Sequence, residues 1–228
     1  MGTLYLVSTP IGNLEDITIR ATKIFVSVDI LLCEDTRRTG ILLDQLNISP
    51  KPTLMQFYED IEDKKTPEII ELLLSGKNIA LVSDAGTPLI SDPGHRLVRE
   101  AIKRHIPVVA IPGASALLTA LVASGLPSNT FTFLGFAPEK EAHRRKLFTN
   151  LLGANKALES TYILYCAPHK LAITLMTMKE ILGDVSIVLA RELTKIHEEF
   201  FRGTISEAES YFESPKGEFV ILFHLPYH

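Results

Sequence analysis

The stretch Ala80–Gly94, ALVSDAGTPLISDPG, decides how this chain folds. It begins as a short apolar strand and continues into a loop of Asp, Ser, Thr, Gly and Pro, the residues that form turns. A helical pattern precedes the strand Ile79–Val82, and an apolar helical stripe over residues 97–102 follows the loop. A strand between two helices is typical of a parallel sheet with helical crossovers.

The same alternation runs through the first half of the chain. The predicted strands are Leu4–Val7, Ile30–Cys33, Ile79–Val82 and Val108–Ile111. The predicted helices are Ile17–Val28, capped near Asp16, then Thr36–Leu46, a helix from Thr66–Pro67 to Ser75, and the one over residues 97–102. Pro in the first turn and Gly76 just beyond the end favour the third helix. The pattern predicts an α/β layer with a mostly parallel sheet.

Strand-like runs lie closer together after Ile111–Pro127. They are Phe131–Phe136, Thr161–Tyr165, Ser186–Ala190, Glu198–Phe201 and Glu218–Phe223, with helices predicted at Glu139–Leu152, His169–Lys179 and Ile205–Phe212. Their β-branched and aromatic content favours a mixed sheet with antiparallel pairs. We therefore predict two α/β domains, residues 1–113 and 114–228, with a cleft between them.

Composition narrows the class of protein. The 228 residues are 46% hydrophobic and 22% charged, as in globular proteins, and the net charge of −4 argues against a general nucleic-acid binder. Basic runs such as Arg37–Arg38 and Arg144–Lys146 are typical of a solvent-facing helix surface when each is taken alone. Cys33 and Cys166 are predicted to be buried core residues. With no signal peptide and no membrane-length apolar run, we expect a soluble, cytoplasmic protein without a metal.

Three loops follow predicted strands and carry Gly, Pro and hydroxyl residues. They are STPIGN (Ser8–Asn13), SDAGTPLISDPG (Ser83–Gly94) and PGASA (Pro112–Ala116). In open α/β sheets, ligands bind beyond the carboxyl ends of the strands, and glycine lets the backbone approach them closely. None of the loops is a dinucleotide or Walker fingerprint. They could be only turns and helix caps, for which Asp92–Pro93 is well suited, but three such loops favour a shared ligand site.

Seven stretches, in order along nearly the whole chain, resemble the ribosomal RNA small-subunit methyltransferase I family of the tetrapyrrole methylase superfamily. They are LYLVSTPIGNLEDIT, CEDTRRTG, LVSDAGTPLISDPGHRLV, PGASALLTALVASGLP, FLGF, ARELTKIHEEFFRGT and KGEFVIL. The resemblance implies a two-domain α/β enzyme with S-adenosylmethionine in the cleft, usually a homodimer. The implied reaction is methyl transfer to the 2′-hydroxyl of a cytidine in small-subunit (16S) rRNA, free or within a ribosomal subunit.

The resemblance also assigns site residues. It implies cofactor contacts at Pro10, Asp84, Ala85, Gly86, Ile90, Ser115, Ala116, Cys166 and Leu193, and substrate contacts at Asn13, Arg37 and Arg38. Asp84 and the backbone of its loop would face a zwitterionic ligand with a cationic sulfonium, which oxygen atoms suit.

Methyl transfer to a ribose hydroxyl needs in-line positioning and removal of the hydroxyl proton. The segment CEDTRR places Glu34 and Asp35 directly after a strand, and we expect them to be the catalytic carboxylates. Arg37 would then contact a phosphate or a carboxylate. The alternative is that Asp35 or Thr36 caps the following helix and Arg37 pairs with a neighbouring carboxylate.

The chain departs from the family pattern at positions that affect the expected target nucleotide and RNA binding more than the expected fold or cofactor. CAPHK (Cys166–Lys170) stands where the family usually has Glu-Ser-Pro-His-Arg, and Lys lacks the planar fork of Arg. MQFYEDIED (Met55–Asp63) lacks the usual histidines, and we expect the chain to lack the small C-terminal extension that many relatives carry. Two alternatives stay open: a tetrapyrrole C-methyltransferase, which needs an apolar cleft for a macrocycle, and a non-catalytic ribosome-binding relative without a cofactor.

Overall fold

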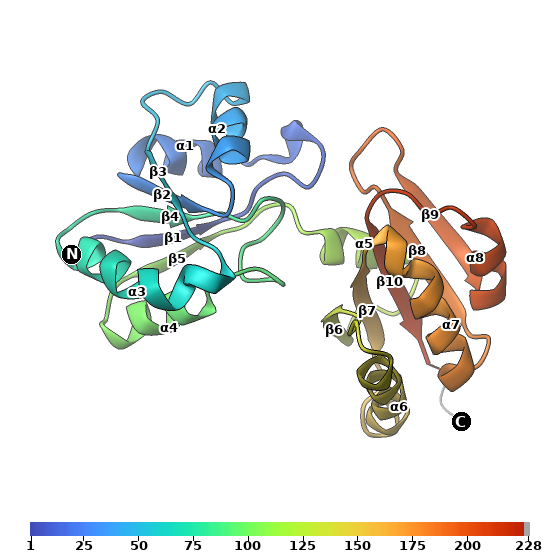
Figure 1. The fold of residues 1–228 in the computed structure, drawn as a ribbon. Coiled ribbons are helices and arrows are strands. Elements are labelled where there is room, and N and C mark those ends of the chain that lie inside the picture. Colours follow the sequence, from blue (N-terminus) through green and yellow to red (C-terminus); the bar gives the residue numbers. More distant parts are fainter. Residues whose placement is uncertain (226–228) are drawn as a thin grey trace. The chain divides into compact units, whose positions relative to one another are not determined.

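The computed structural model describes residues 1–225 and divides into two compact units, Met1–Ser115 (unit 1) and the part from Ala116 onward (unit 2) (Figure 1). The division predicted from the sequence, between residues 113 and 114, lies two residues before this boundary. Within the described residues, no helix is long and apolar enough to cross a membrane.

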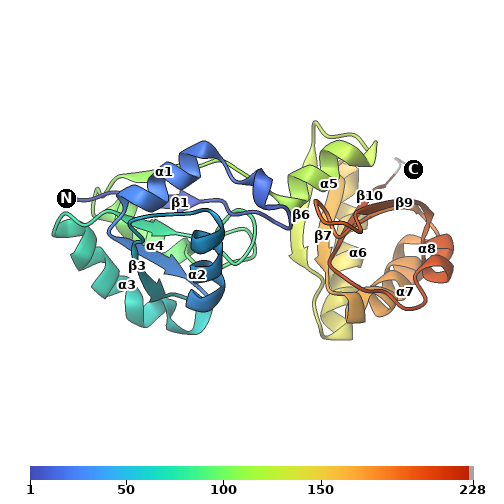
Figure 2. The same ribbon diagram turned by 90° about the horizontal axis from the view of Figure 1, so that it is seen from above.

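Unit 1 is a five-stranded sheet with helices on both faces (Figures 1 and 2). Its strands are β1 (Leu4–Val7), β2 (Ile30–Cys33), β3 (Thr53–Gln56), β4 (Ile79–Leu81) and β5 (Val108–Ile111). Its helices are the 3₁₀ turn η1 (Leu14–Asp16), α1 (Ile19–Ser27), α2 (Thr36–Gln45), α3 (Glu59–Leu74) and α4 (His95–Lys103). The strand order is β3-β2-β4-β1-β5 and all neighbours are parallel, so the five carboxyl ends share one edge.

Both faces of this sheet are buried. Leu31 and Cys33 of β2 belong to a core cluster with residues of α1 and α2, whereas Ile30 and Leu32 belong to a second cluster with residues of α3 and α4. A strand covered on both faces has no polar side, which explains the uninterrupted apolar sequence of β2. The predicted parallel layer is confirmed, and Cys33 is a free, buried core residue.

Three local predictions in unit 1 were wrong or incomplete. The third helix begins at Glu59 rather than at Thr66, and Pro67 lies inside it. Its acidic first turn suits the positive end of the helix dipole, and Pro removes only one N–H donor. The first helix begins at Ile19 rather than at Ile17, and its cap is Thr18, two residues after Asp16; the Thr18 hydroxyl accepts from the Ala21 N–H at 3.0 Å. The sequence analysis did not anticipate β3.

Asp92 does not cap α4. The N-cap residue is Gly94, which makes no side-chain hydrogen bond. Instead Glu62 of α3, only 6% exposed, accepts from the backbone N–H groups of Arg96 at 2.8 Å and Leu97 at 3.3 Å. The first N–H groups of a helix lack partners within it, so a carboxylate from a packed neighbour replaces a local cap. This arrangement leaves Asp92 without a capping role.

Unit 2 contains the second sheet. Its strands are β6 (Phe131–Phe136), β7 (Thr161–Cys166), β8 (Ser186–Arg191), β9 (Glu199–Thr204) and β10 (Phe219–His224). Its helices are α5 (Ala116–Ser124), α6 (Glu141–Ala157), the 3₁₀ turn η2 (Pro168–Lys170), α7 (Leu171–Leu182) and α8 (Ile205–Tyr211). The order is β6-β7-β10-β8-β9, parallel between β6 and β7 and antiparallel elsewhere, which confirms the predicted mixed sheet.

One basic residue of unit 2 contradicts the prediction of a solvent-facing helix surface. Arg144 of α6 is only 2% exposed. Its guanidinium donates to Thr177 Oγ1 at 3.0 Å and to the carbonyl oxygens of Pro138 and Glu139 at 3.2 and 3.0 Å. These acceptors compensate the loss of water and fix the segment that leads into α6.

Candidate functional site

Four polar loops lie side by side at the carboxyl edge of the unit 1 sheet. The segment CEDTRR begins at the end of β2, SDAGTPLISDPG follows β4, STPIGN follows β1 and PGASA follows β5. The strand order β2-β4-β1-β5 makes them consecutive in space although they are far apart in the sequence. Parallel sheets bind ligands at this edge.

Hydrogen bonds tie three of these loops together. Thr9 and Gly86 form an isolated bridge in which each backbone N–H donates to the other carbonyl, at 2.9 and 3.0 Å. The hydroxyls of Ser8 and Thr87 lie 3.1 Å apart, and Thr87 donates to the carbonyl oxygen of Ala114 at 3.1 Å. Because Ser8 and Thr9 are buried, these bonds are shielded from water and hold the loops in one arrangement.

Glycine permits the close approach of these loops. Gly86 has φ of +84°, and a Cβ there would lie 3.3 Å from Ile11 Cγ2. A Cβ on Gly113 would lie 2.8 Å from the Cβ of Ser8, closer than real side chains come. Gly113 therefore permits the close packing of the loop after β5 on the loop after β1, and the positive φ of Gly86 favours glycine in the loop after β4.

The loop after β4 also contains left-handed residues other than glycine. Leu89 has φ of +71° and Ser91 has φ of +66°, a conformation that is unusual for any side chain and most unusual for a bulky one. Such backbone geometry is found where surrounding structure enforces it, often at ligand sites. Asp84 and Asp92 of the same loop both lie close enough to Glu34 of the β2 loop to interact with it electrostatically.

Asp84 is held on one oxygen only. Its Oδ2 accepts from Arg38 Nη1 at 2.6 Å. Its Oδ1 is buried and has no hydrogen-bond partner in the part of the chain that the structure describes. Buried polar atoms are nearly always paired, so this acceptor requires a donor from outside residues 1–225.

Two neighbouring carboxyl groups are hard to ionise. Burial and the charge of Asp84 raise the pKa of Glu34, although a hydrogen bond with the Asp84 backbone opposes the shift. Burial and the charge of Glu34 raise the pKa of Asp92 to about 6, against a hydrogen bond with the side chain of Ser83. A carboxyl group with a pKa near neutrality can accept and release a proton under physiological conditions.

The Asp35 carboxylate is engaged in hydrogen bonds with Arg37. Its Oδ1 accepts from the backbone N–H of Arg37 at 2.8 Å and caps α2. The Arg37 guanidinium binds both carboxylate oxygens, at 3.2 and 3.1 Å, and lowers the pKa of Asp35. The capping alternative is confirmed for Asp35, which argues against this residue as a base. The Arg37 side chain is 88% exposed.

The other predicted site residues fall into both units. Unit 1 carries Pro10, Asn13, Ala85, Ile90 and Ser115, all in the loops at the carboxyl edge. Asn13 caps η1 by accepting from the Glu15 N–H at 3.0 Å. Unit 2 carries Ala116 at the start of α5, Cys166 at the end of β7 and Leu193 just after β8. Because β7 and β8 both run antiparallel to β10, Cys166 and Leu193 lie at the same edge of the second sheet. Their roles stay predictions.

Sequence reasoning missed two features of this edge. Asp92 was considered only as a cap, although a second acidic residue in the same Gly- and Pro-rich loop was a usable signal. The pairing of Arg38 with Asp84 had no local signal, because it depends on β2 lying beside β4. Within the described residues, no group of three or more His, Cys, Asp and Glu side chains could hold a metal ion.

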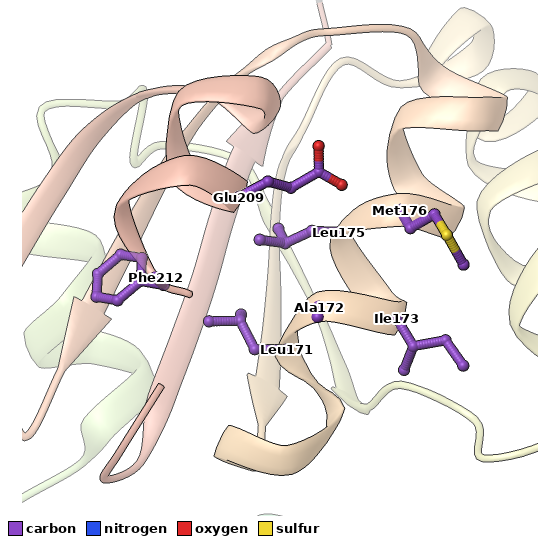
Figure 3. Close-up of a pocket in the computed structure, with 7 residues that line it drawn as sticks. All are labelled: Leu171, Ala172, Ile173, Leu175, Met176, Glu209 and Phe212. Atoms are coloured by element: carbon purple, nitrogen blue, oxygen red, sulfur yellow. The ribbon is translucent and has the colours of Figure 1, made fainter. Parts of the chain in front are cut away.

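A separate pocket of about 430 Å³ lies in unit 2, between α7 and α8 (Figure 3). Its lining is mostly apolar and includes Leu171, Leu175 and Met176 from α7, with Phe212 just after α8. Glu209 of α8 also lines it and pairs with Lys179 at 2.9 Å. None of the predicted site residues lines this pocket.

Comparison with known proteins identifies the family. The family model of Tetrapyrrole (Corrin/Porphyrin) Methylases matches residues 3–209. The chain belongs to the tetrapyrrole methylase family. Within it, the chain is 47% identical to "Ribosomal RNA small subunit methyltransferase I" of Thermotoga maritima, over 97% of this chain and 98% of that protein. The protein of the same name from Hydrogenobaculum sp. is 49% identical over 90% and 86%. The resemblance found in the sequence is confirmed.

Solved structures show the tetrapyrrole methylase fold. Diphthine synthase matches with a TM-score of 0.75 at 13% identity, covering 100% of this chain and 92% of that one. The uroporphyrin-III C-methyl transferase from Thermus thermophilus, complexed with S-adenyl homocysteine, matches with a TM-score of 0.64 at 15% identity and 97% coverage of both chains. At such low identity these likenesses concern the fold alone, and they confirm the predicted fold class.

Proposed function

We propose that this protein is an S-adenosylmethionine-dependent methyltransferase that modifies the 2′-hydroxyl of a cytidine in small-subunit rRNA. The observation that carries the proposal is the set of hydrogen-bonded loops at the ends of β4, β1 and β5, beside the unpaired Asp84 Oδ1. The names of relatives that are 47–49% identical support the RNA substrate over the tetrapyrrole C-methyltransferase alternative.

The residues present fit such a cofactor. When bound, S-adenosylmethionine supplies a methyl group activated by a sulfonium. The Asp84 Oδ1 is an acceptor without a donor in the described residues. Because Gly86 has no side chain, the backbone of its loop is accessible to a ligand. We propose that Pro10, Ala85, Ile90, Ser115, Ala116, Cys166 and Leu193 complete the cofactor contacts.

We propose that Glu34, with Asp92 beside it, receives the proton of the ribose hydroxyl. Asp35 is less suited, because its carboxylate is already occupied by the α2 cap and by Arg37. Burial and the charge of Asp84 raise the pKa of Glu34, and the charge of Glu34 in turn raises the pKa of Asp92, so an additional negative charge among these carboxyl groups is disfavoured. The remaining contribution of the protein is to bind and orient the two substrates.

The direct test is methylation of small-subunit particles and of free rRNA with a labelled methyl donor, followed by mapping of the modified nucleotide. We expect a 2′-O-methylcytidine in the rRNA. A modified base, or labelling of a tetrapyrrole instead of RNA, would contradict the proposed substrate. By the family resemblance we further propose that the enzyme is a homodimer and acts in the cytoplasm.

Arg37 is proposed to contact the RNA backbone together with Asn13. Its high exposure allows the guanidinium to exchange Asp35 for a phosphate. Arg37→Ala should then weaken RNA binding, leave S-adenosylhomocysteine affinity nearly unchanged and reduce the slope of log affinity against log salt by about one. Titration of an rRNA fragment at several salt concentrations measures this. An unchanged slope with normal methylation would remove Arg37 from the site and leave it only the role of steadying Asp35.

A further inference from the structure

Neighbouring arginines of α2 have different partners. Arg37 binds Asp35 in the first turn of its own helix, whereas Arg38 reaches across to Asp84 in the loop after β4. Successive residues of a helix project about 100° apart, so the two guanidinium groups need not serve the same ligand. The sequence analysis had assigned both to the substrate.

The Arg38–Asp84 pair is asymmetric. Arg38 Nη1 lies 2.6 Å from Asp84 Oδ2, and the Asp84 side chain is 28% exposed against 68% for Arg38. The second oxygen, Oδ1, is the buried atom without a partner in the described chain. A contact to Oδ2 alone fixes the rotation of the carboxylate and leaves Oδ1 free to accept from a ligand.

Arg38 also offsets the surrounding negative charge. The Asp84 carboxylate lies close enough to raise the pKa of both Glu34 and Asp92, and the charge of Arg38 opposes the rise at Glu34.

From this geometry we infer that Arg38 is a positioning residue for Asp84 and not an RNA contact. Its guanidinium holds Oδ2 so that Oδ1 accepts a hydrogen bond from an N–H or O–H group of the bound cofactor. The inference rests on the proposed function, because S-adenosylhomocysteine is the ligand used to test it.

The test is calorimetric titration of S-adenosylhomocysteine into the wild-type protein, Arg38→Met, Arg38→Lys, Asp84→Asn and the double variant Arg38→Met/Asp84→Asn. We expect Arg38→Met to weaken binding about tenfold, which corresponds to about 1.4 kcal/mol. Arg38→Lys should recover part of this, because Lys keeps the charge without the fork. The double variant should bind no more weakly than Asp84→Asn alone, since Arg38 acts through Asp84.

A matched control breaks a different surface ion pair in unit 1. Lys77 binds Asp29 at 2.8 Å, and Asp29 directly precedes β2, at the opposite end of the strand from Arg38. Lys77→Met should leave S-adenosylhomocysteine affinity unchanged. Thermal unfolding of every variant verifies that the proteins compared are folded.

Each result decides between the positioning role and an RNA role. Wild-type cofactor affinity in Arg38→Met, together with a shallower salt dependence of RNA binding, would overturn the inference and return Arg38 to the substrate. Additive losses in the double variant would also overturn it. If the wild-type protein itself binds no S-adenosylhomocysteine, the proposed function fails first and the inference fails with it.

Discussion

A Gly86→Val variant should lose affinity for S-adenosylhomocysteine by about 100-fold, because the branched side chain would displace a ligand bound at these loops, and a misplacement of about 1 Å has effects of this size. The new Cβ would lie 3.3 Å from Ile11 Cγ2, which a small shift of the Ile11 side chain relieves, but the two methyl groups of Val would extend further into the space between the loops after β1 and β4. The φ of +84° adds backbone strain of roughly 1–2 kcal/mol, so the variant should also be less stable than the wild type.

Gly183 provides the control for strain alone. It has φ of +81°, and a Cβ there would meet nothing within 4 Å. Gly183→Val should therefore lose stability through backbone strain and keep its affinity. Calorimetric titration and thermal unfolding of both variants measure the two effects. Equal affinities of Gly86→Val and the wild type would show that the cofactor does not bind at these loops.

An Asp92→Asn variant should be more stable than the wild type above pH 6 and no more stable below pH 4. The folded-state pKa of about 6 exceeds the ordinary value of 3.8, so the native state holds the proton more tightly than the unfolded chain. The wild type therefore loses stability as the pH rises through this interval. The shift of about two pKa units corresponds to at most about 3 kcal/mol. Asn can still bind Ser83 but cannot ionise beside Glu34 and Asp84.

Denaturant unfolding between pH 4 and pH 8 measures this difference. Asp29→Asn is the control of opposite sign, because hydrogen bonds from Lys77 and the Asn78 backbone lower the pKa of Asp29. That variant should lose stability near neutral pH and recover relative to the wild type as the pH falls. A stability difference between Asp92→Asn and the wild type that does not change with pH would mean that ionisation of Asp92 does not destabilise the folded protein. If Asp92→Asn stabilises the protein and also slows methylation, the ionisable carboxyl group of Asp92 serves the reaction at a cost in stability.

The sequence predicted the parallel sheet because the apolar runs of its strands have no polar alternation. It also predicted the loops that meet at the carboxyl edge, since each combines glycine or proline with hydroxyl or acidic residues directly after a strand. These patterns are local in the sequence, and they predict the structure correctly where local preference and tertiary packing favour the same conformation.

Other features depended on contacts between distant segments. The buried Glu62 caps a helix to which it does not belong, and the buried Arg144 of α6 donates to the hydroxyl of Thr177 in α7. The start of α3 was misplaced because Pro67 is typical of a first turn, yet packing extends the helix past it. The raised pKa of Asp92 requires the neighbourhood of Glu34, which only the strand order creates.

The position of β1 between β4 and β5 determines when the unit 1 sheet can form during synthesis of the chain. β1 is the first strand to be synthesised, but its two neighbours are β4 and β5, and the latter ends at Ile111. At translation rates of 5–20 residues per second, β1 waits roughly 5 to 20 seconds for its second neighbour. The hydrogen bond from Thr87 to the carbonyl oxygen of Ala114 can form only after that wait. A chain released before residue 108 would therefore leave one edge of β1 without its partner strand and would lack the loop after β5.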